Sequence, residues 1–196
     1  MRAMRIVAGM FGALLLTLPV TAQPGRAAQD AEEKAEAARL AADPALSPQA
    51  NAAFLANNLK QPGVMKRTSG LQYKIIQNGY GRHPGGADIV EVYYTGKLIN
   101  GKVFDGTSPG LPATFGVGQV VPGWIEALQL MREGDHWQLF LPAAIAYGAR
   151  GTPDGAVPPN QTLIFDIRLL SSRPPPRKGE PGYQPQPGES NDDSQR

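Results

Sequence analysis

The chain has 196 residues, of which 23 are Gly, 19 are Pro and none is Cys, with a formal net charge of +2. Glycine and proline make up roughly a fifth of it, which disfavours a helical bundle, and the lack of cysteine excludes a disulfide scaffold, a thiolate zinc site and a cysteine nucleophile. The small positive excess equals the two arginines at positions 2 and 5, so the charge gives no support for nucleic-acid binding.

Residues 1–22 have the features of a secretory signal peptide. Arg2 and Arg5 supply positive charge, Ile6–Leu18 is apolar, and Val20-Thr-Ala22 offers the small residues of a cleavage site. The apolar run is shorter than the ~20 residues that span a bilayer, although an uncleaved anchor remains the alternative. The sequence thus predicts export, in the first place to the periplasm.

Two helices are predicted in the segment 23–66. Asp30–Ala42 is rich in Ala and Glu, with Asp30 as its N-cap. A second helix is expected to start at Ser47 as N-cap and Pro48 as first residue, and to run to about Lys60. Either these helices self-associate or they only lead into the following domain.

From Leu71 the pattern changes to short alternating runs bounded by Gly and Pro, which is typical of strands. We expect strands at Leu71–Ile76, Ile89–Thr95, Lys97–Ile99, Lys102–Phe104, Trp137–Leu141 and Leu163–Leu170, with Asn100-Gly101 as a hairpin turn. One amphipathic helix, Trp124–Met131, interrupts them. The pattern predicts an α+β domain over 67–171, in which a curved antiparallel sheet wraps around one short helix.

The segment 172–196 contains six prolines and no aliphatic residue. It cannot bury enough apolar surface to offset its ordering entropy, so we expect a disordered tail. A polyproline II ligand around Pro174–Pro176 is the alternative.

The search for reactive groups is mostly negative. Only two histidines occur; His83 is expected in a turn and His136 at a strand start, neither beside a carboxylate–serine set. Glu126 and Glu133 could flank a glycosidic bond, but a solvated helix face is favoured. We expect no metal and no cofactor.

Several aromatic residues instead lie beside the predicted strand ends and loops. They are Tyr94, Phe104, Phe115, Trp124, Tyr147 and Phe165, accompanied by Asp105, Val120 and Val121. Such a set either forms an ordinary core or lines an apolar pocket with a few polar groups. A pocket without nucleophile or metal suits binding, or a reaction that needs no proton transfer.

Four stretches resemble the FK506-binding (FKBP) type of peptidyl-prolyl cis–trans isomerase. These are Val92-Tyr-Tyr-Thr-Gly-Lys-Leu-Ile-Asn-Gly-Lys-Val-Phe-Asp105, Phe115-Gly-Val-Gly-Gln-Val-Val-Pro-Gly-Trp124, Leu141-Pro-Ala-Ala-Ile-Ala-Tyr-Gly148 and Val157-Pro-Pro-Asn-Gln-Thr-Leu-Ile-Phe-Asp166. They occur in the family's order. Ser69–Tyr73 and the helical leader are similar to the exported macrophage-infectivity-potentiator branch. That branch implies a homodimer through a longer helical segment, whereas this chain has about 44 residues before the domain.

The resemblance implies a role for each pocket residue. Trp124 would form the floor beneath a proline ring, and the Val121 N–H and the Tyr147 hydroxyl would bond substrate carbonyls. The catalytic set it implies is Tyr94, Phe104, Asp105, Val121, Trp124, Tyr147 and Phe165, with Val120, Phe115 and Val157 as further substrate-binding residues.

The resemblance also implies binding partners, and the sequence departs from the family pattern at a few positions. The partners would be proline-containing unfolded or folding polypeptides and FK506-like macrolides. Ala113 replaces an aromatic residue that the family often has, and Asp105 has no arginine in the loop Gly106–Gly110. The loop Ala149–Ala156 differs in length and carries no aromatic residue. A non-catalytic peptide-binding chaperone and an interaction module remain alternatives to an isomerase.

Overall fold

The computed structural model describes residues 24–176 and residue 180, and the signal-peptide prediction lies outside them, as does most of the predicted tail. In chain order the α-helices are α1 Pro24–Ala41, α2 Pro48–Asn58 and α3 Pro122–Leu130. The strands are β1 Val64–Lys66, β2 Gln72–Gln77, β3 Ile89–Leu98, β4 Val103–Gly106, β5 Ala113–Gly116, β6 His136–Leu141 and β7 Leu163–Arg173. None of the helices in the described part is long and apolar enough to cross a membrane.

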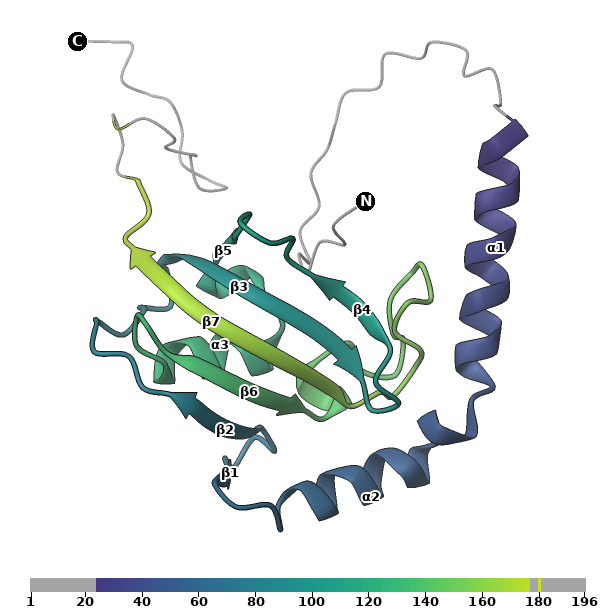
Figure 1. Cartoon of the computed structure of the whole chain (residues 1–196), viewed down its shortest axis with the longest axis horizontal. Coiled ribbons are helices and arrows are strands. Elements are labelled where there is room, and N and C mark those ends of the chain that lie inside the picture. Colours follow the sequence, from purple (N-terminus) through teal and green to yellow (C-terminus); the bar gives the residue numbers. More distant parts are fainter. Residues whose placement is uncertain (1–23, 177–179, 181–196) are drawn as a thin grey trace, which may run out of the picture.

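The strands form one antiparallel sheet in the order β1-β2-β6-β7-β3-β4, with β5 also paired to β3 (Figure 1). β3 and β7 are the longest neighbours, and their register runs from Ile89 opposite Arg173 to Leu98 opposite Leu163. β3 is therefore the strand that joins β4, β5 and β7 into one surface.

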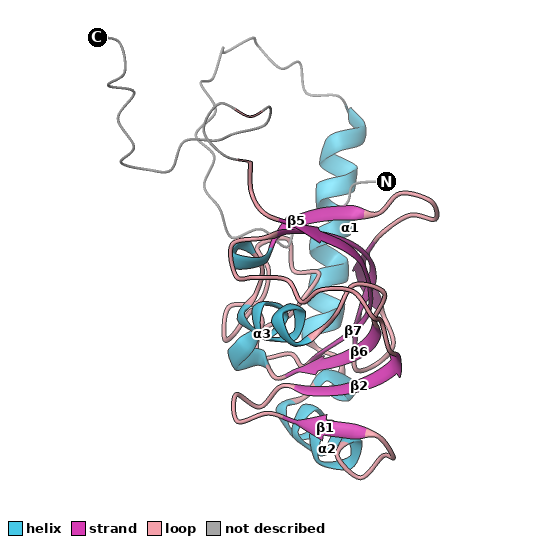
Figure 2. Cartoon of the chain, turned by 90° about the vertical axis from the view of Figure 1, so that its left-hand side faces the viewer, coloured by secondary structure: helices cyan, strands magenta, loops and turns pink. Residues whose placement is uncertain are grey.

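Alternation of apolar residues explains how the sheet buries one face. In β3, Val90 and Val92 are fully buried, and in β7 the buried residues are Leu163, Phe165, Ile167 and Leu169. This face covers α3, whose buried Trp124, Ala127 and Leu128 follow helical spacing. Figure 2 shows the sheet curving around α3. The predicted α+β architecture, with the sheet wrapped around one short helix, is confirmed.

Several element boundaries differ from the predictions. β3 continues without a break to Leu98, so the expected separate strand Lys97–Ile99 is wrong, whereas Asn100-Gly101 does form the turn, with Gly101 at φ +86°. Two strands, β1 and β5, were not predicted because three or four residues are too short to display alternation.

The N-terminal helices also depart from the expectation. α1 begins at Pro24 rather than at Asp30, so Asp30 is a mid-helix residue and not an N-cap. Ala27 and Ala28 extend the helix toward its start because alanine has the highest helix propensity, and Pro24 is accepted at the first helical position. The start of α2 is confirmed: Ser47 is its N-cap, and its side chain accepts a hydrogen bond from the Ala50 N–H.

Two buried asparagines attach α2 to the domain. The Asn51 amide donates to Gln161 Oε1 at 3.0 Å, and its oxygen accepts from the Thr162 N–H at 2.7 Å. At the other end of α2, Asn58 donates to Gln72 Oε1 at 2.8 Å. Phe54 lies 6.0 Å from Phe140, ring centre to ring centre. The N-terminal segment therefore packs on its own domain through specific buried polar contacts.

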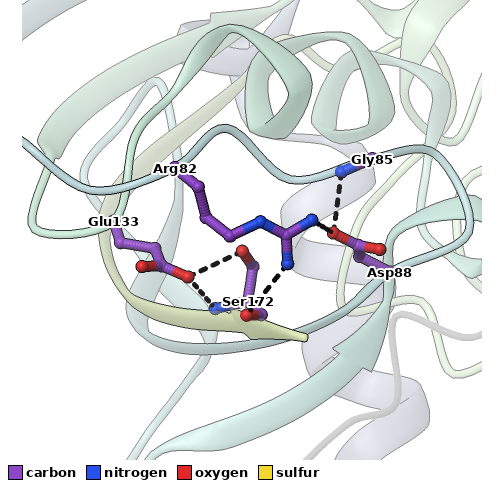
Figure 3. Close-up of polar contacts among 5 residues, drawn as sticks. All are labelled: Arg82, Gly85, Asp88, Glu133 and Ser172. Carbon is purple, nitrogen blue, oxygen red and sulfur yellow. Dashed lines mark hydrogen bonds and ion pairs between the residues drawn. The ribbon is translucent and has the colours of Figure 1, made fainter. Parts of the chain in front are cut away.

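The far end of β7 is fastened by a polar network (Figure 3). Glu133 accepts hydrogen bonds from the Ser172 N–H at 2.7 Å and its hydroxyl at 2.8 Å. Arg82 donates to the Ser172 carbonyl and forms an ion pair with Asp88 at 2.6 Å. Ser172 and Arg173 thus belong to the sheet rather than to the tail, because this network extends the strand beyond its last apolar residue, Leu170.

Candidate substrate pocket

Trp124 is the centre of an aromatic cluster. The indole is fully buried in the first turn of α3, where Pro122 starts the helix and places the next residues against the sheet. Three rings meet it nearly perpendicularly: Tyr94 with centroids 5.3 Å apart, Phe115 at 5.8 Å and Phe165 at 5.2 Å. Such edge-to-face contacts fix the position of the indole.

Gly96 determines where the outer ring of the cluster lies. Phe104 packs on Phe165 at 5.7 Å, directly over the β3 backbone at Gly96. A Cβ at position 96 would lie 2.7 Å from the Phe104 ring and 2.8 Å from the Phe165 ring. Because real Cβ atoms do not approach so closely, glycine is required for both rings to keep these positions.

Asp105 links the cluster to polar chemistry. This buried carboxylate accepts a hydrogen bond from the Tyr94 hydroxyl at 2.7 Å. Burial raises the pKa of Tyr94, and the hydrogen bond to Asp105 raises it further. Tyr94 therefore stays neutral over the physiological range, and its hydroxyl proton is committed to Asp105. Thr107 accepts from the Tyr94 N–H at 3.2 Å and holds the β3–β4 edge beside this pair.

The Tyr147 hydroxyl is buried and has no hydrogen-bond partner among the described residues. Burial, together with the nearby charges of Asp105 and Asp154, raises the pKa of Tyr147 to about 12. A neutral phenol whose O–H is unpaired in a buried position is unusual, because leaving a polar group unsatisfied costs about 1–3 kcal/mol. Trp124 Nε1 is likewise buried and unpartnered. The Tyr147 hydroxyl therefore keeps an unused donor, as the predicted substrate contact requires.

The entry to α3 supplies a backbone donor. Val120 is buried and Val121 half-buried, and both stand immediately before the helix in extended conformation. The Val121 carbonyl accepts from the Trp124 and Ile125 N–H groups, while its own N–H donates to none of the described residues. Position 121 thus leaves a free donor next to the Trp124 ring.

The loop from Gly148 to Val157 flanks Tyr147 and is internally bonded. The Val157 N–H donates to the Thr152 hydroxyl at 2.9 Å, and the Thr152 N–H donates to the Val157 carbonyl at 2.9 Å. Val157 itself is buried in the domain core. Its buried side chain ties the loop to the core.

The structure brings together most of the residues singled out from the sequence. Ring contacts connect five of the aromatic residues, and a hydrogen bond adds the carboxylate; they are Tyr94, Phe104, Phe115, Trp124, Phe165 and Asp105. Ala113, where the family often has an aromatic residue, packs half-buried against the same core. The structural role of Gly96 was missed, although the quoted hairpin motif contains this glycine.

The residues set aside in the sequence have structural partners. His83 is exposed and contacts the Met131 carbonyl at 2.8 Å, and His136 contacts the Asp166 carboxylate at 2.8 Å. Glu126 pairs with Arg67. Glu133 lies beyond the end of α3 and bonds Ser172, so the helix-face interpretation is wrong for it. No group of acidic or histidine side chains in the described part is arranged to hold a metal ion.

Comparisons of the sequence and of the fold with known proteins point to one family. Residues 81–170 match the model of the "FKBP-type peptidyl-prolyl cis-trans isomerase", and residues 3–75 match the "Domain amino terminal to FKBP-type peptidyl-prolyl isomerase". An outer membrane protein MIP of Legionella longbeachae is 56% identical over 120 residues, 61% of this chain and 51% of that protein. The chain thus spans about half the length of that relative.

A second relative is covered more completely. The FKBP-type 22 kDa peptidyl-prolyl cis-trans isomerase of Escherichia coli is 44% identical over 146 residues, which are 74% of this chain and 70% of that protein. Among solved structures, FkpA from Escherichia coli superposes with a TM-score of 0.64 at 32% identity, covering 80% of this chain and 76% of that one. The chain therefore belongs to the FKBP-type peptidyl-prolyl cis–trans isomerase family.

Proposed function

We propose that the protein is a peptidyl-prolyl cis–trans isomerase that binds the prolyl group of an X–Pro bond on Trp124. The observation that carries this proposal is the buried indole framed edge-on by Tyr94, Phe115 and Phe165. The Tyr147 hydroxyl supplies an unpaired donor in the same domain. Family membership supports it, since the relatives named as isomerases share this part of the chain.

An apolar pocket suffices for this reaction. Rotation about the prolyl bond is slow because amide resonance gives a barrier of ~18–20 kcal/mol. Twisting the C–N bond removes that resonance and reduces the charge separation across the amide. A dry aromatic pocket therefore disfavours the planar ground state more than the twisted transition state. A hundred-fold acceleration requires only ~2.7 kcal/mol of such differential stabilisation.

The polar groups position the substrate. The Val121 N–H and the Tyr147 O–H bond carbonyl oxygens of the substrate, which satisfies two donors that otherwise lack partners. Asp105 holds the Tyr94 hydroxyl and orients polar groups at the rim of the pocket. No group has to accept or release a proton, because no covalent bond to hydrogen changes.

Phe104 and Val120 complete the walls, and Val157 anchors the loop that closes one side. FK506-like macrolides are expected to compete with proline-containing peptides for the same pocket. The Ala113 side chain is smaller than an aromatic one and leaves more space at one wall of the pocket. Bulky residues next to proline are therefore expected to be accepted.

Export and assembly belong to the same proposal. The signal-peptide features of residues 1–22 support export to the periplasm, as does the name of the Legionella relative, an outer membrane protein. There the protein assists the folding of proline-containing polypeptides. A homodimer through residues 23–66 is tested by light scattering on the whole chain: a mass near 42 kDa indicates a dimer, and a mass near the 20.9 kDa of one chain excludes it.

The activity is tested with a short X–Pro peptide whose isomerisation is followed by protease coupling. The wild-type protein is compared with the triple variant Trp124→Ala, Phe104→Ala, Tyr147→Phe, after circular dichroism has shown that the variant is folded. Loss of acceleration in the variant is expected. Full activity in the triple variant would reject the site, and an inactive wild type that suppresses aggregation would favour a non-catalytic chaperone.

A further inference from the structure

A groove of about 860 Å³ runs between α1 and the rim of the substrate pocket. One side is α1, with Glu32, Glu33 and Leu40 among its lining residues. The other side consists of the start of β4, at Val103 and Phe104, and of the loop residues 154–156. Figure 1 shows α1 standing beside this loop and the edge of the sheet at β4.

Specific contacts fix the position of α1 against the domain. Lys102 forms an ion pair with Glu36, which lowers the pKa of that carboxyl through the side-chain hydrogen bond and the lysine charge. Asn100 donates to the Asp43 carboxylate at 2.8 Å, just beyond the end of α1. At the loop, Gly155 approaches Ala37 so closely that a Cβ at position 155 would lie 2.3 Å from the alanine methyl. These contacts therefore hold α1, which forms one wall of the groove, in a defined position.

The lining combines an apolar floor with a negative rim. Leu40 is buried at its base, and Val103 is 53% exposed toward solvent. Of the charged lining residues, Glu36 is engaged by Lys102 and lies 3.9 Å from Arg39. The remaining acids, Glu32, Glu33 and Asp154, have no cationic partner in the described part of the chain.

The groove is continuous with the proposed active site. Phe104 lines it and also packs on Phe165, which contacts the Trp124 floor. Asp154 lines the groove and acts through its charge on Tyr147. Phe104 is therefore a wall common to the groove and to the proposed prolyl site.

We propose that this groove binds the segment of the polypeptide substrate next to the X–Pro bond, and that it selects segments carrying lysine or arginine. The aliphatic stems of these residues cover the exposed Val103, while their charged ends reach Glu32, Glu33 and Asp154. The inference rests on the proposed isomerase activity and adds a substrate class to it.

The test compares four peptides that share one X–Pro core. One is the bare core of about four residues; the others extend it on both sides by five residues, rich in lysine, in glutamate or in serine. We expect the lysine-flanked peptide to have a KM roughly five-fold lower than the glutamate-flanked one at low salt, since each exposed ion pair contributes little. In 1 M salt, where the screening length falls to about 3 Å, the two KM values should converge.

Variants assign the effect to the groove. The double variant Glu32→Gln, Glu33→Gln should remove most of the preference for lysine and leave kcat/KM for the bare core unchanged. Asp30→Asn is the matched control, because Asp30 is an exposed acid on the same helix that does not line the groove. That variant should keep the preference in full.

Three outcomes would overturn the proposal. Equal KM values for the lysine- and glutamate-flanked peptides would show that the groove does not select by charge. A preference that survives in full in the double variant would place the selection elsewhere. Selectivity that emerges only after removal of residues 174–196 would assign the groove to the chain's own tail. Failure of the activity itself is separate, because it appears as no turnover of the bare core.

Discussion

The aromatic pocket and the acidic groove share Phe104 but differ in the chemistry that surrounds it. The pocket is built around the fully buried Trp124, and its carboxylate, Asp105, is buried and hydrogen-bonded to Tyr94. The groove is open to solvent, and Glu32, Glu33 and Asp154 line it without cationic partners in the described part of the chain. Under the two proposals, the cluster recognises the prolyl group and the groove recognises the residues next to it.

This difference in burial and charge determines which property of a substrate each region would recognise. In the proposed mechanism, ring contacts and desolvation act on the prolyl group in every X–Pro sequence and are insensitive to salt. Charges in an open groove act on the neighbouring residues and are screened by salt. Variants that alter one region and spare the other should separate acceleration from selection.

The largest effect is expected from Gly96→Ala. The added methyl would have to displace Phe104 and Phe165, which lie 2.7 and 2.8 Å from its position. A misplacement of about 1 Å in a positioned site can cost on the order of 100-fold in rate, and we expect a fall of that size in kcat/KM for the bare X–Pro peptide.

Gly86→Ala is the matched control for this substitution. A Cβ at position 86 meets only the Gln129 side chain, at an ordinary 3.5 Å. Steady-state kinetics on both variants should show a loss in the first and none in the second. Equal activity in the two would mean that the position of the Phe104 ring does not matter for catalysis.

Tyr147→Phe should separate activity from stability. The variant removes a hydroxyl that has no partner in the described part of the chain but that bonds the substrate under our proposal. Loss of one such hydrogen bond, about 1.4 kcal/mol, should lower kcat/KM roughly tenfold. The free energy of unfolding should be unchanged or slightly higher, because an unsatisfied buried polar group has been deleted.

Urea titration and kinetics on the same samples check this pair of expectations. Tyr93→Phe is the control, since Tyr93 alternates with the buried Tyr94 on β3 and makes no side-chain hydrogen bond to a described residue. A stability loss in Tyr147→Phe with unchanged kinetics would show that the hydroxyl supports the fold instead.

The raised pKa of Tyr147 predicts a loss of stability at alkaline pH. An unfolded tyrosine releases its proton near pH 10, whereas burial keeps Tyr147 protonated to about pH 12 in the folded protein. Between these values the unfolded chain binds fewer protons, so the free energy of unfolding falls as pH rises from 10 to 12. Chemical denaturation along this range should give a shallower fall in Tyr147→Phe; parallel curves would contradict the assignment.

The smallest effect is expected from Lys102→Met, which removes the ion pair with Glu36 and loosens the wall of the groove. Amide hydrogen exchange in α1 should accelerate about threefold, since exposed ion pairs contribute little. Turnover of the bare X–Pro peptide should not change. Lys97→Met, at an exposed lysine of β3 without an ion pair in the described part, should leave the exchange of α1 as it was.

The sequence was most informative where a strand or helix is long enough for its alternation or helical spacing to be recognised. The alternating residues of β3 and β7 and the helical spacing from Trp124 to Leu128 predicted which side chains are buried, and these side chains position most of the pocket. Asn100-Gly101 predicted the turn that precedes Phe104, because few other residue pairs adopt that backbone conformation.

Contacts between distant segments could not be read in this way. The distance from Gly96 to the Phe104 and Phe165 rings depends on how β4 folds over β3, and local patterns do not encode it. The groove requires α1 to lie against residues more than 60 positions later, through single contacts such as Lys102 to Glu36. Ser172 joins the sheet because Glu133 and Arg82, which are distant from it in the sequence, form hydrogen bonds with it.

The most direct test of the central claim is magnetisation exchange between the cis and trans forms of a short uncharged X–Pro peptide, measured by NMR at low salt and in 1 M salt. We predict that a catalytic amount of the protein brings the exchange from tens or hundreds of seconds into the range of seconds or less, equally at both salt concentrations. A peptide that binds at Trp124 and still exchanges at the uncatalysed rate would contradict the account.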